Sequence, residues 1–182
     1  IYLALGMTVF GLIVGVGFGY GITPEYRTSM YEKNSMDLGS ADRTFDLRYI
    51  NAMIAHHRGA MLLAEQLEKN TTRSEMKTLA QNILADEPKA IAELYAWKKD
   101  WYGDTKNVRD PIVANLGSQD EKFDLRFLNA IIAHHEDGIV MTQETRQKSS
   151  RVEILNNADA VEAFLTNGLQ ALQDLRKNWY NL

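Results

Sequence analysis

The residues best suited to chemistry in this chain are its four histidines, which occur as two adjacent pairs, His56-His57 and His134-His135. Neutral imidazole binds copper, zinc, iron and nickel, and it also exchanges protons near neutral pH. The chain has no cysteine, so thiolate metal sites and disulfides are excluded. Any soft ligand beside the histidines must therefore be one of the seven methionines.

Each histidine pair closes a longer motif, and the two motifs form part of an internal repeat. The motifs span residues 45–57 and 123–135, and the offset is 78 residues, as from His56 to His134. The similarity continues without a gap over repeats 38–104 and 116–182. Such self-similarity predicts two copies of one supersecondary unit.

Apolar residues three or four positions apart predict amphipathic helices in both repeats, and no strand-like alternation occurs. We expect each repeat to form a hairpin of two long helices. The second helix would begin with a capping box, Thr72-x-x-Glu75 or Ser150-x-x-Glu153. Two such hairpins predict an all-α fold, a four-helix bundle over residues 40–182.

Helical spacing places the two histidines of a pair about 100° apart around the helix. On the first helix one apolar stripe consists of Ile50, Met53, His57, Ala60, Ala64 and Leu67. We therefore expect His57 and its counterpart His135 to point inward and to approach each other at the bundle centre. His56 and His134 are expected on the flanks of these stripes.

The candidate metal site combines the histidines with methionines at helical spacing. Its members are His56, His57, His134, His135, Met53, Met61 and Met141. Imidazole with thioether favours copper, so copper is the predicted cofactor. The alternative is structural, with each buried imidazole hydrogen-bonded to Asp46, Asp124 or a backbone carbonyl and with the methionines as core filler.

At these residues the chain resembles a bacterial family of ferritin-like four-helix-bundle proteins, long described as of unknown function, which includes CopM-like periplasmic copper-binding proteins. The family pattern is roughly Asp-x-x-Phe/Tyr-x-x-x-Met-x-x-His-His-x-x-Ala-x-x-Met. The first repeat supplies Asp46, Tyr49, Met53, His56, His57 and Ala60, with Leu63 at the last position. The second supplies Asp124, Phe127, His134, His135 and Met141, with Ile131 and Gly138 as departures. The resemblance implies the ferritin-like fold, copper binding and an extracytoplasmic location.

Residues 1–22 carry no charged side chain. As a helix they would span roughly 33 Å, enough to cross a bilayer. We expect a single-pass transmembrane anchor there, followed by a tether over 23–39 and by the bundle on the extracytoplasmic side. Gly11, Gly15 and Gly19 are spaced by four, a pattern that lets another transmembrane helix approach closely. Membrane lipid and a partner helix are therefore predicted contacts.

Two functions fit these features. The first is a membrane-anchored, extracytoplasmic copper-binding protein that buffers or delivers metal. The second is an accessory subunit of a larger membrane complex, respiratory or photosynthetic, that retains a vestigial metal site. A net charge of −4 without a basic run argues against nucleic acid as a partner. No nucleophile is paired with a base, so we do not expect an enzyme.

Overall fold

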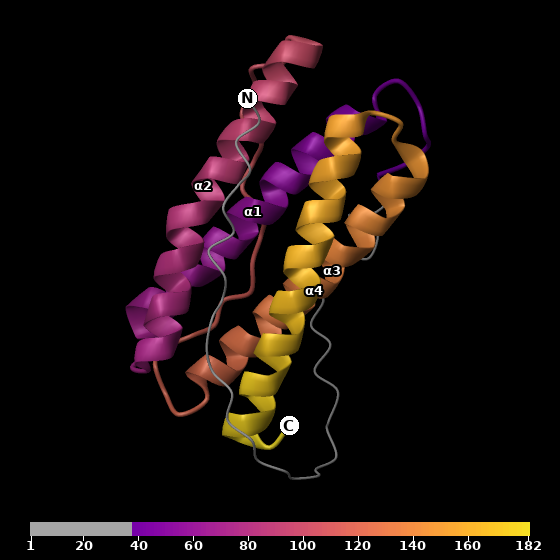
Figure 1. Cartoon of the computed structure of the whole chain (residues 1–182). Coiled ribbons are helices and arrows are strands. Elements are labelled where there is room, and N and C mark those ends of the chain that lie inside the picture. The colour runs from indigo at the N-terminus through magenta and orange to yellow at the C-terminus, as the bar shows by residue number, and fades with distance from the viewer. Residues whose placement is uncertain (1–37) are drawn as a thin grey trace.

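The computed structural model describes residues 38–182, in which all regular structure is helical. The helices are α1 (Phe45–Asn70), α2 (Ser74–Tyr102), α3 (Phe123–Lys148) and α4 (Val152–Tyr180). The predicted all-α four-helix architecture is confirmed (Figure 1). The predicted anchor, the tether up to residue 37 and the glycine ridge lie outside the described residues. Within 38–182, no helix has the length and apolar character that a membrane crossing requires.

The four helices form two hairpins that cross. In the first hairpin α1 packs along α2, and in the second α3 packs along α4. The hairpins meet where α1 crosses α3, while α2 and α4 lie on the outside and make little contact with each other (Figure 1). Each of the inner helices α1 and α3 therefore buries two sides, one against its own hairpin partner and one against the other inner helix.

Each repeat enters its first helix through the same turn. Gly39 and Gly117 have φ of +78° and +74°, a left-handed conformation that glycine adopts without steric penalty. Arg48 and Arg126 donate from Nε to the carbonyl of the leucine before that glycine, at 2.5 and 2.6 Å. Both arginines also pair with the aspartate six residues earlier, at 3.0 and 2.9 Å. The two repeats thus share these hydrogen bonds and ion pairs as well as the residues that make them.

The predicted capping boxes at the start of the second helices are wrong. The N-cap residues are Arg73 and Arg151, and neither end has a side-chain capping hydrogen bond. Because Arg73 is extended (φ −81°, ψ 129°), α2 begins one residue too late for Thr72 to cap it. Instead the hydroxyls of Thr71 and Ser149 accept the backbone N–H two residues on, both at 3.2 Å.

Matching clusters join the two hairpins at both ends of the bundle. Each links the arginine that precedes the second helix of one repeat to an aspartate and a tryptophan of the other: Arg73 with Asp124 and Trp179, and Arg151 with Asp46 and Trp101. The Nε–Oδ2 distances are 3.2 and 3.3 Å, and the guanidinium carbons lie 4.3 and 4.2 Å from the indole ring centroids. This agreement is what the pseudo-two-fold relation between the repeats requires.

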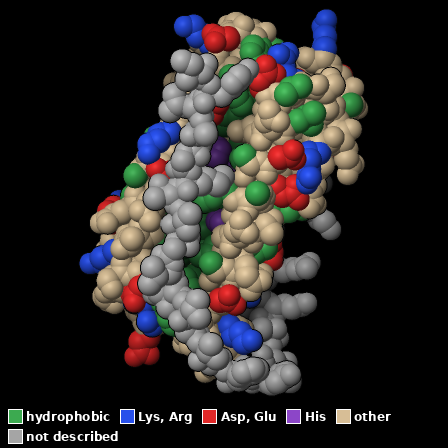
Figure 2. Space-filling model, viewed as in Figure 1, with side chains coloured by type: hydrophobic (Ala, Val, Ile, Leu, Met, Phe, Trp, Pro, Cys, Tyr) green, Lys and Arg blue, Asp and Glu red, His purple; other side chains and the backbone are tan. Residues whose placement is uncertain are grey.

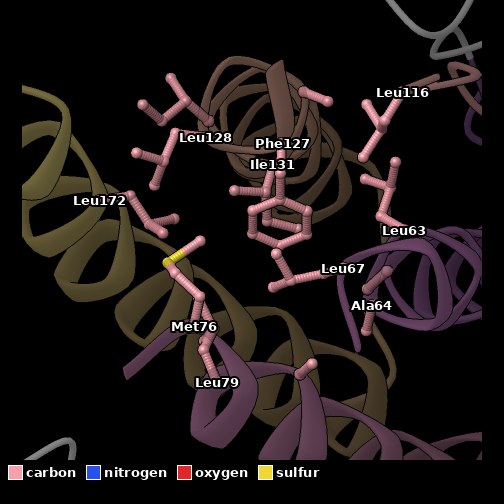
Figure 3. Packing of buried hydrophobic residues seen from close by; sticks show 14 of the residues in the cluster. Leu63, Ala64, Leu67, Met76, Leu79, Leu116, Phe127, Leu128, Ile131 and Leu172 are labelled. Carbon is pink, nitrogen blue, oxygen red and sulfur yellow. The ribbon is translucent and has the colours of Figure 1, made fainter. Parts of the chain in front are cut away.

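Two apolar clusters fill the interior, and all four helices contribute to each. The Phe45 core contains Phe45, Tyr49, Ile50, Met53, Ile54, Leu94, Met141 and Ile154 among others. The Phe123 core contains Leu63, Leu67, Met76, Phe123, Phe127, Leu128, Ile131 and Leu172 among others, and Figure 3 shows most of its residues. Because α1 and α3 run through the cores in opposite order, their central residues lie between the two cores. The histidine pairs occupy these central positions.

Replacing Arg151 with alanine should destabilise the bundle by about 1–2 kcal/mol, the sum expected for a partly exposed ion pair and a cation–π contact. Urea unfolding followed by circular dichroism measures this loss. Lys77→Ala, which removes an exposed cation from α2, is the control and should change stability by less than about 0.5 kcal/mol. An Arg151→Ala variant as stable as Lys77→Ala would show that the cluster does not hold the hairpins together.

Candidate metal centre

The two inner helices cross at a pair of stacked histidines. His56 of α1 and His134 of α3 have ring centroids 3.8 Å apart and planes inclined by 19°. Both side chains are buried. The prediction that His57 and His135 meet at the centre, with His56 and His134 on the flanks, is therefore wrong. The reason is that α1 buries two sides, and its side toward α3 carries His56.

The other two histidines extend the stack outward to α2 and α4. His57 Nδ1 is hydrogen-bonded to the Glu87 carboxylate of α2. The ring of His135 lies 6.5 Å from the ring of Phe164 on α4. Within each pair the ring centroids are 6.1 Å (first pair) and 6.3 Å (second pair) apart. The four imidazoles thus form a row across the bundle, here called the histidine row, and histidine atoms are visible between α2 and α4 (Figure 2).

Two glycines leave room for this row. A Cβ on Gly138 would lie 2.5 Å from both His56 Nε2 and a methyl carbon of Leu165. A Cβ on Gly168 would lie 2.9 Å from His135 Nε2. The first repeat has alanine at both equivalent positions, 60 and 90. The row is therefore packed differently on its two sides, although the helices that carry it are related by the repeat.

Burial keeps the inner imidazoles neutral. Desolvation, followed by the nearby charge of His57, lowers the pKa of His56 to about 3. Desolvation likewise places the pKa of His134 well below its ordinary value and lowers the pKa of His135 to about 4. The backbone carbonyl of His134 lies 3.1 Å from His56 Nε2, and a carbonyl only accepts. Neutral His56 thus carries its hydrogen on Nε2 and has its lone pair on Nδ1.

The predicted methionine ligands are not equally placed. Met53 and Met141 are both buried in the Phe45 core, on one side of the histidine row. Their repeat equivalents, Ile131 and Leu63, lie in the Phe123 core on the other side. Met61 is partly buried and lies in neither core. The structure therefore brings two of the three predicted thioethers to the same side of the row.

Imidazole and carboxylate groups alone do not make up a metal site in the described part of the chain. Among residues 38–182, no three histidine, aspartate or glutamate side chains lie close enough together to hold a metal. Within the same part of the chain, His57 Nε2 is buried without a hydrogen-bond partner, which is the condition of a donor atom that awaits a ligand. Neutral imidazoles of the row together with the two thioethers of the Phe45 core would make a soft, uncharged donor set that fits Cu(I).

Sequence reasoning missed Glu87, Gly138 and Gly168 as neighbours of the histidines. Glu87 lies on the outer helix, 30 residues from His57, so no local motif connects the two. The repeat offers the one available signal, because position 87 is Glu in the first copy and position 165 is Leu in the second. Most positions differ between the two copies, so this difference by itself does not single out Glu87.

Comparison with known proteins gives the class and then a particular relative. Residues 46–115 match the model of a family described as a domain of unknown function (DUF305). The Cu(I)-bound structure of CopM is similar, with a TM-score of 0.66 and 25% identity over 74% of this chain and 97% of that chain. The apo form gives a TM-score of 0.65 and 25% identity over 74% and 98% of the two chains. For the Cu(II)-bound form the TM-score is 0.62 and the identity 24%, over 74% and 97%.

Curated protein sequences gave no significant match. This chain is therefore a four-helix-bundle protein similar to the DUF305 family, and in its fold it is similar to CopM. The resemblance predicted from the two His-His motifs is confirmed.

The buried histidines predict a bundle that loses stability in mild acid. Unfolded histidines titrate near pH 6.5, whereas His56 and His135 have folded pKa values of about 3 and about 4, and that of His134 is also lowered. Below pH ~6.5 the unfolded chain takes up protons that the folded chain excludes. This contribution to stability is therefore complete above pH ~6.5 and falls by up to about 1.4 kcal/mol per histidine for each pH unit below it. Asp137, whose pKa burial raises to about 6, acts in the opposite sense, but it is one group against three.

Urea unfolding at pH 7.5 and pH 5 measures this effect, and the protein should be less stable at pH 5. His134→Phe keeps an aromatic ring in the stack and removes one titrating group, so the loss between the two pH values should be smaller in that variant. Equal stability of the wild-type protein at both values would contradict the burial of neutral imidazoles.

Proposed function

We propose that this protein binds copper, chiefly as Cu(I), through imidazoles of the histidine row and the thioethers of Met53 and Met141. The observation that carries the proposal is the arrangement of these groups. Four imidazoles cross the middle of the bundle, and two buried thioethers lie on one side of them. Imidazole binds copper in both oxidation states, and thioether selects Cu(I).

Similarity to CopM supports the proposal. CopM has been observed with Cu(I), Cu(II) and Ag bound, and this chain spans almost all of the CopM chain. The first of the two pairs of adjacent histidines lies within residues 46–115, the part of the chain that matches the family model. Nothing in the proposal requires a carboxylate ligand, because neutral imidazoles and thioethers suffice for a singly charged soft ion.

Copper binding at the centre would disturb the stack. In two nearly parallel rings the lone pairs run side by side and do not converge on one point, so at least one ring must turn for both to bind the same ion. Histidine atoms are visible at the surface between α2 and α4, so the row is not wholly enclosed by the bundle (Figure 2). Uncharged ligands and a row that reaches the surface suit a protein that buffers or delivers copper.

Replacing both methionines of the Phe45 core should weaken Cu(I) binding at least ~10-fold and Cu(II) binding less, because thioether prefers the softer ion. We would titrate the purified whole chain, and the Met53→Leu, Met141→Leu double variant, against a chelator that competes for each oxidation state. Met76→Leu is the matched control, because Met76 is equally buried but belongs to the Phe123 core.

A second double variant, His56→Ala with His134→Ala, tests the imidazoles of the stack and should lose affinity for both oxidation states. If the wild-type chain binds neither ion, the proposed function is wrong. If the Met76→Leu control loses as much Cu(I) affinity as the double variant, the thioethers of the Phe45 core are not ligands.

We further propose, from the sequence alone, that copper is bound at an extracytoplasmic membrane surface by a chain anchored through residues 1–22. An anchored chain should stay in the membrane pellet after alkaline carbonate extraction, and release into the supernatant would overturn the anchor. The alternative role in a larger membrane complex depends on the ridge of Gly11, Gly15 and Gly19. Gly15→Leu should leave membrane insertion intact and should reduce co-purification of partners in mild detergent.

A further inference from the structure

The two outer histidines of the row have different partners although the repeat makes them equivalent. His57 contacts the Glu87 carboxylate, and both side chains are largely buried, with 12% and 15% exposure. The position equivalent to Glu87 is Leu165, so His135 has an apolar side chain where His57 has a carboxylate. The polar environment of the row is thus one-sided.

The hydrogen bond from Glu87 determines what His57 can do. An ionised carboxylate only accepts, so the hydrogen of neutral His57 must be on Nδ1, the atom that Glu87 contacts. The lone pair is then on Nε2. That atom is buried and, within residues 38–182, makes no hydrogen bond. A histidine that donates one N–H to a carboxylate and offers the other nitrogen is arranged as metal-binding histidines usually are.

Nothing else among the described residues explains the position of Glu87. The neighbouring cation Lys89 pairs with Asp86, at 2.7 Å, and not with Glu87. Asp86 is exposed and lies one residue away on the same helix. It therefore carries the same charge close by without touching the imidazole, which makes it a matched control.

We propose that Glu87 is a positioning residue that holds His57 in the tautomer with its lone pair on Nε2, so that the first repeat binds a soft metal ion before His135 of the second does. This inference deepens the proposed copper binding and rests on it. A carboxylate behind the imidazole both fixes the ring and makes Nε2 a stronger donor. His135 has no carboxylate behind it, and the group that acts on its ring is the neutral backbone carbonyl of Ile131, which makes the imidazole a weaker donor than a carboxylate does.

The first measurement needs no metal. Two-bond nitrogen–proton NMR spectra of the whole chain report which nitrogen of a neutral histidine carries the hydrogen. At pH ~8.5, about two units above the ordinary imidazole pKa, wild-type His57 should be the Nδ1–H tautomer. Glu87→Leu removes the acceptor and should abolish this preference, whereas Asp86→Asn should leave it unchanged. An unchanged His57 tautomer in Glu87→Leu would overturn the proposal.

The second measurement follows metal binding with Ag(I), a diamagnetic ion of the same charge as Cu(I). At less than one equivalent, the signals of His57 should change before those of His135. The Ag(I) affinity should fall by about 10- to 100-fold in Glu87→Leu and stay constant in Asp86→Asn. Equal affinities for the wild type and Glu87→Leu, or earlier changes at His135, would overturn the proposal.

Glu87→Gln is a second variant for the case that Glu87→Leu does not fold properly. Glutamine keeps an accepting oxygen of similar reach, so this variant should retain the tautomer and bind Ag(I) with an affinity between those of the wild type and Glu87→Leu. If Glu87→Leu loses helix content, Glu87→Gln replaces it, and wild-type affinity in that variant would count against the proposal. A wild-type chain that binds neither Ag(I) nor copper would overturn the proposed function and the ranking of the two histidines, while the NMR arm would still decide whether Glu87 fixes His57.

Discussion

The stacking of His56 on His134 is the contact on which the arrangement of this bundle depends. Burial of a polar ring in a core is unfavourable unless its nitrogens find partners. This pair lies where α1 crosses α3, and His56 bonds a carbonyl of the opposite helix. The layer divides the apolar interior into the Phe45 and Phe123 cores. Sliding one hairpin along the other would separate the rings and break the bond from His56 to the opposite carbonyl, so the stack favours the observed register, together with the clusters around Arg73 and Arg151.

The helices and their pseudo-symmetry were predictable, because they follow from patterns repeated at a fixed offset. Apolar spacing predicted the helices, and the offset of 78 residues predicted that contacts of one repeat recur in the other. The clusters around Arg73 and Arg151 are an example, because they contain the same contacts at nearly the same distances. The capping boxes failed for a local reason. A sequence motif identifies which hydroxyls are near a helix start, but the backbone decides which of them, Thr71 or Thr72, the turn uses.

Which histidine faces the centre could not be read from one helix alone. Helical spacing places His57 on an apolar stripe of α1. Most of that stripe is buried, but His57 is directed toward Glu87 of α2. The neighbouring face, which carries His56 together with Tyr49 and Leu63, is buried as well. An inner helix has two neighbours, so it has two apolar faces about 100° apart. Which of them meets the other repeat depends on how the hairpins cross, and that is a property of the assembled bundle.

The crossing of the hairpins explains where the methionines that differ between the repeats lie in the bundle. Each repeat keeps one of the two methionine positions that flank the histidines, Met53 in the first and Met141 in the second. In the sequence alone, each repeat simply lacks one of the two methionines. In the bundle, however, α1 and α3 run through the two cores in opposite order, so the retained positions fall in the same core and the lost ones, Leu63 and Ile131, fall together in the other.

A symmetric pair of repeats with both methionines would place two thioethers on each side of the histidine row. At the two repeat-related positions, methionine stands twice on the side of the Phe45 core and not at all on the side of the Phe123 core, whose one buried methionine, Met76, comes from α2. The replacements, Leu63 and Ile131, are apolar side chains of similar volume, a kind of exchange that a packed core tolerates. The Phe45 core therefore holds two thioethers from the inner helices, and the Phe123 core holds apolar side chains at the same two positions. This pattern of substitutions gives a symmetric fold an asymmetric distribution of thioethers around the histidine row.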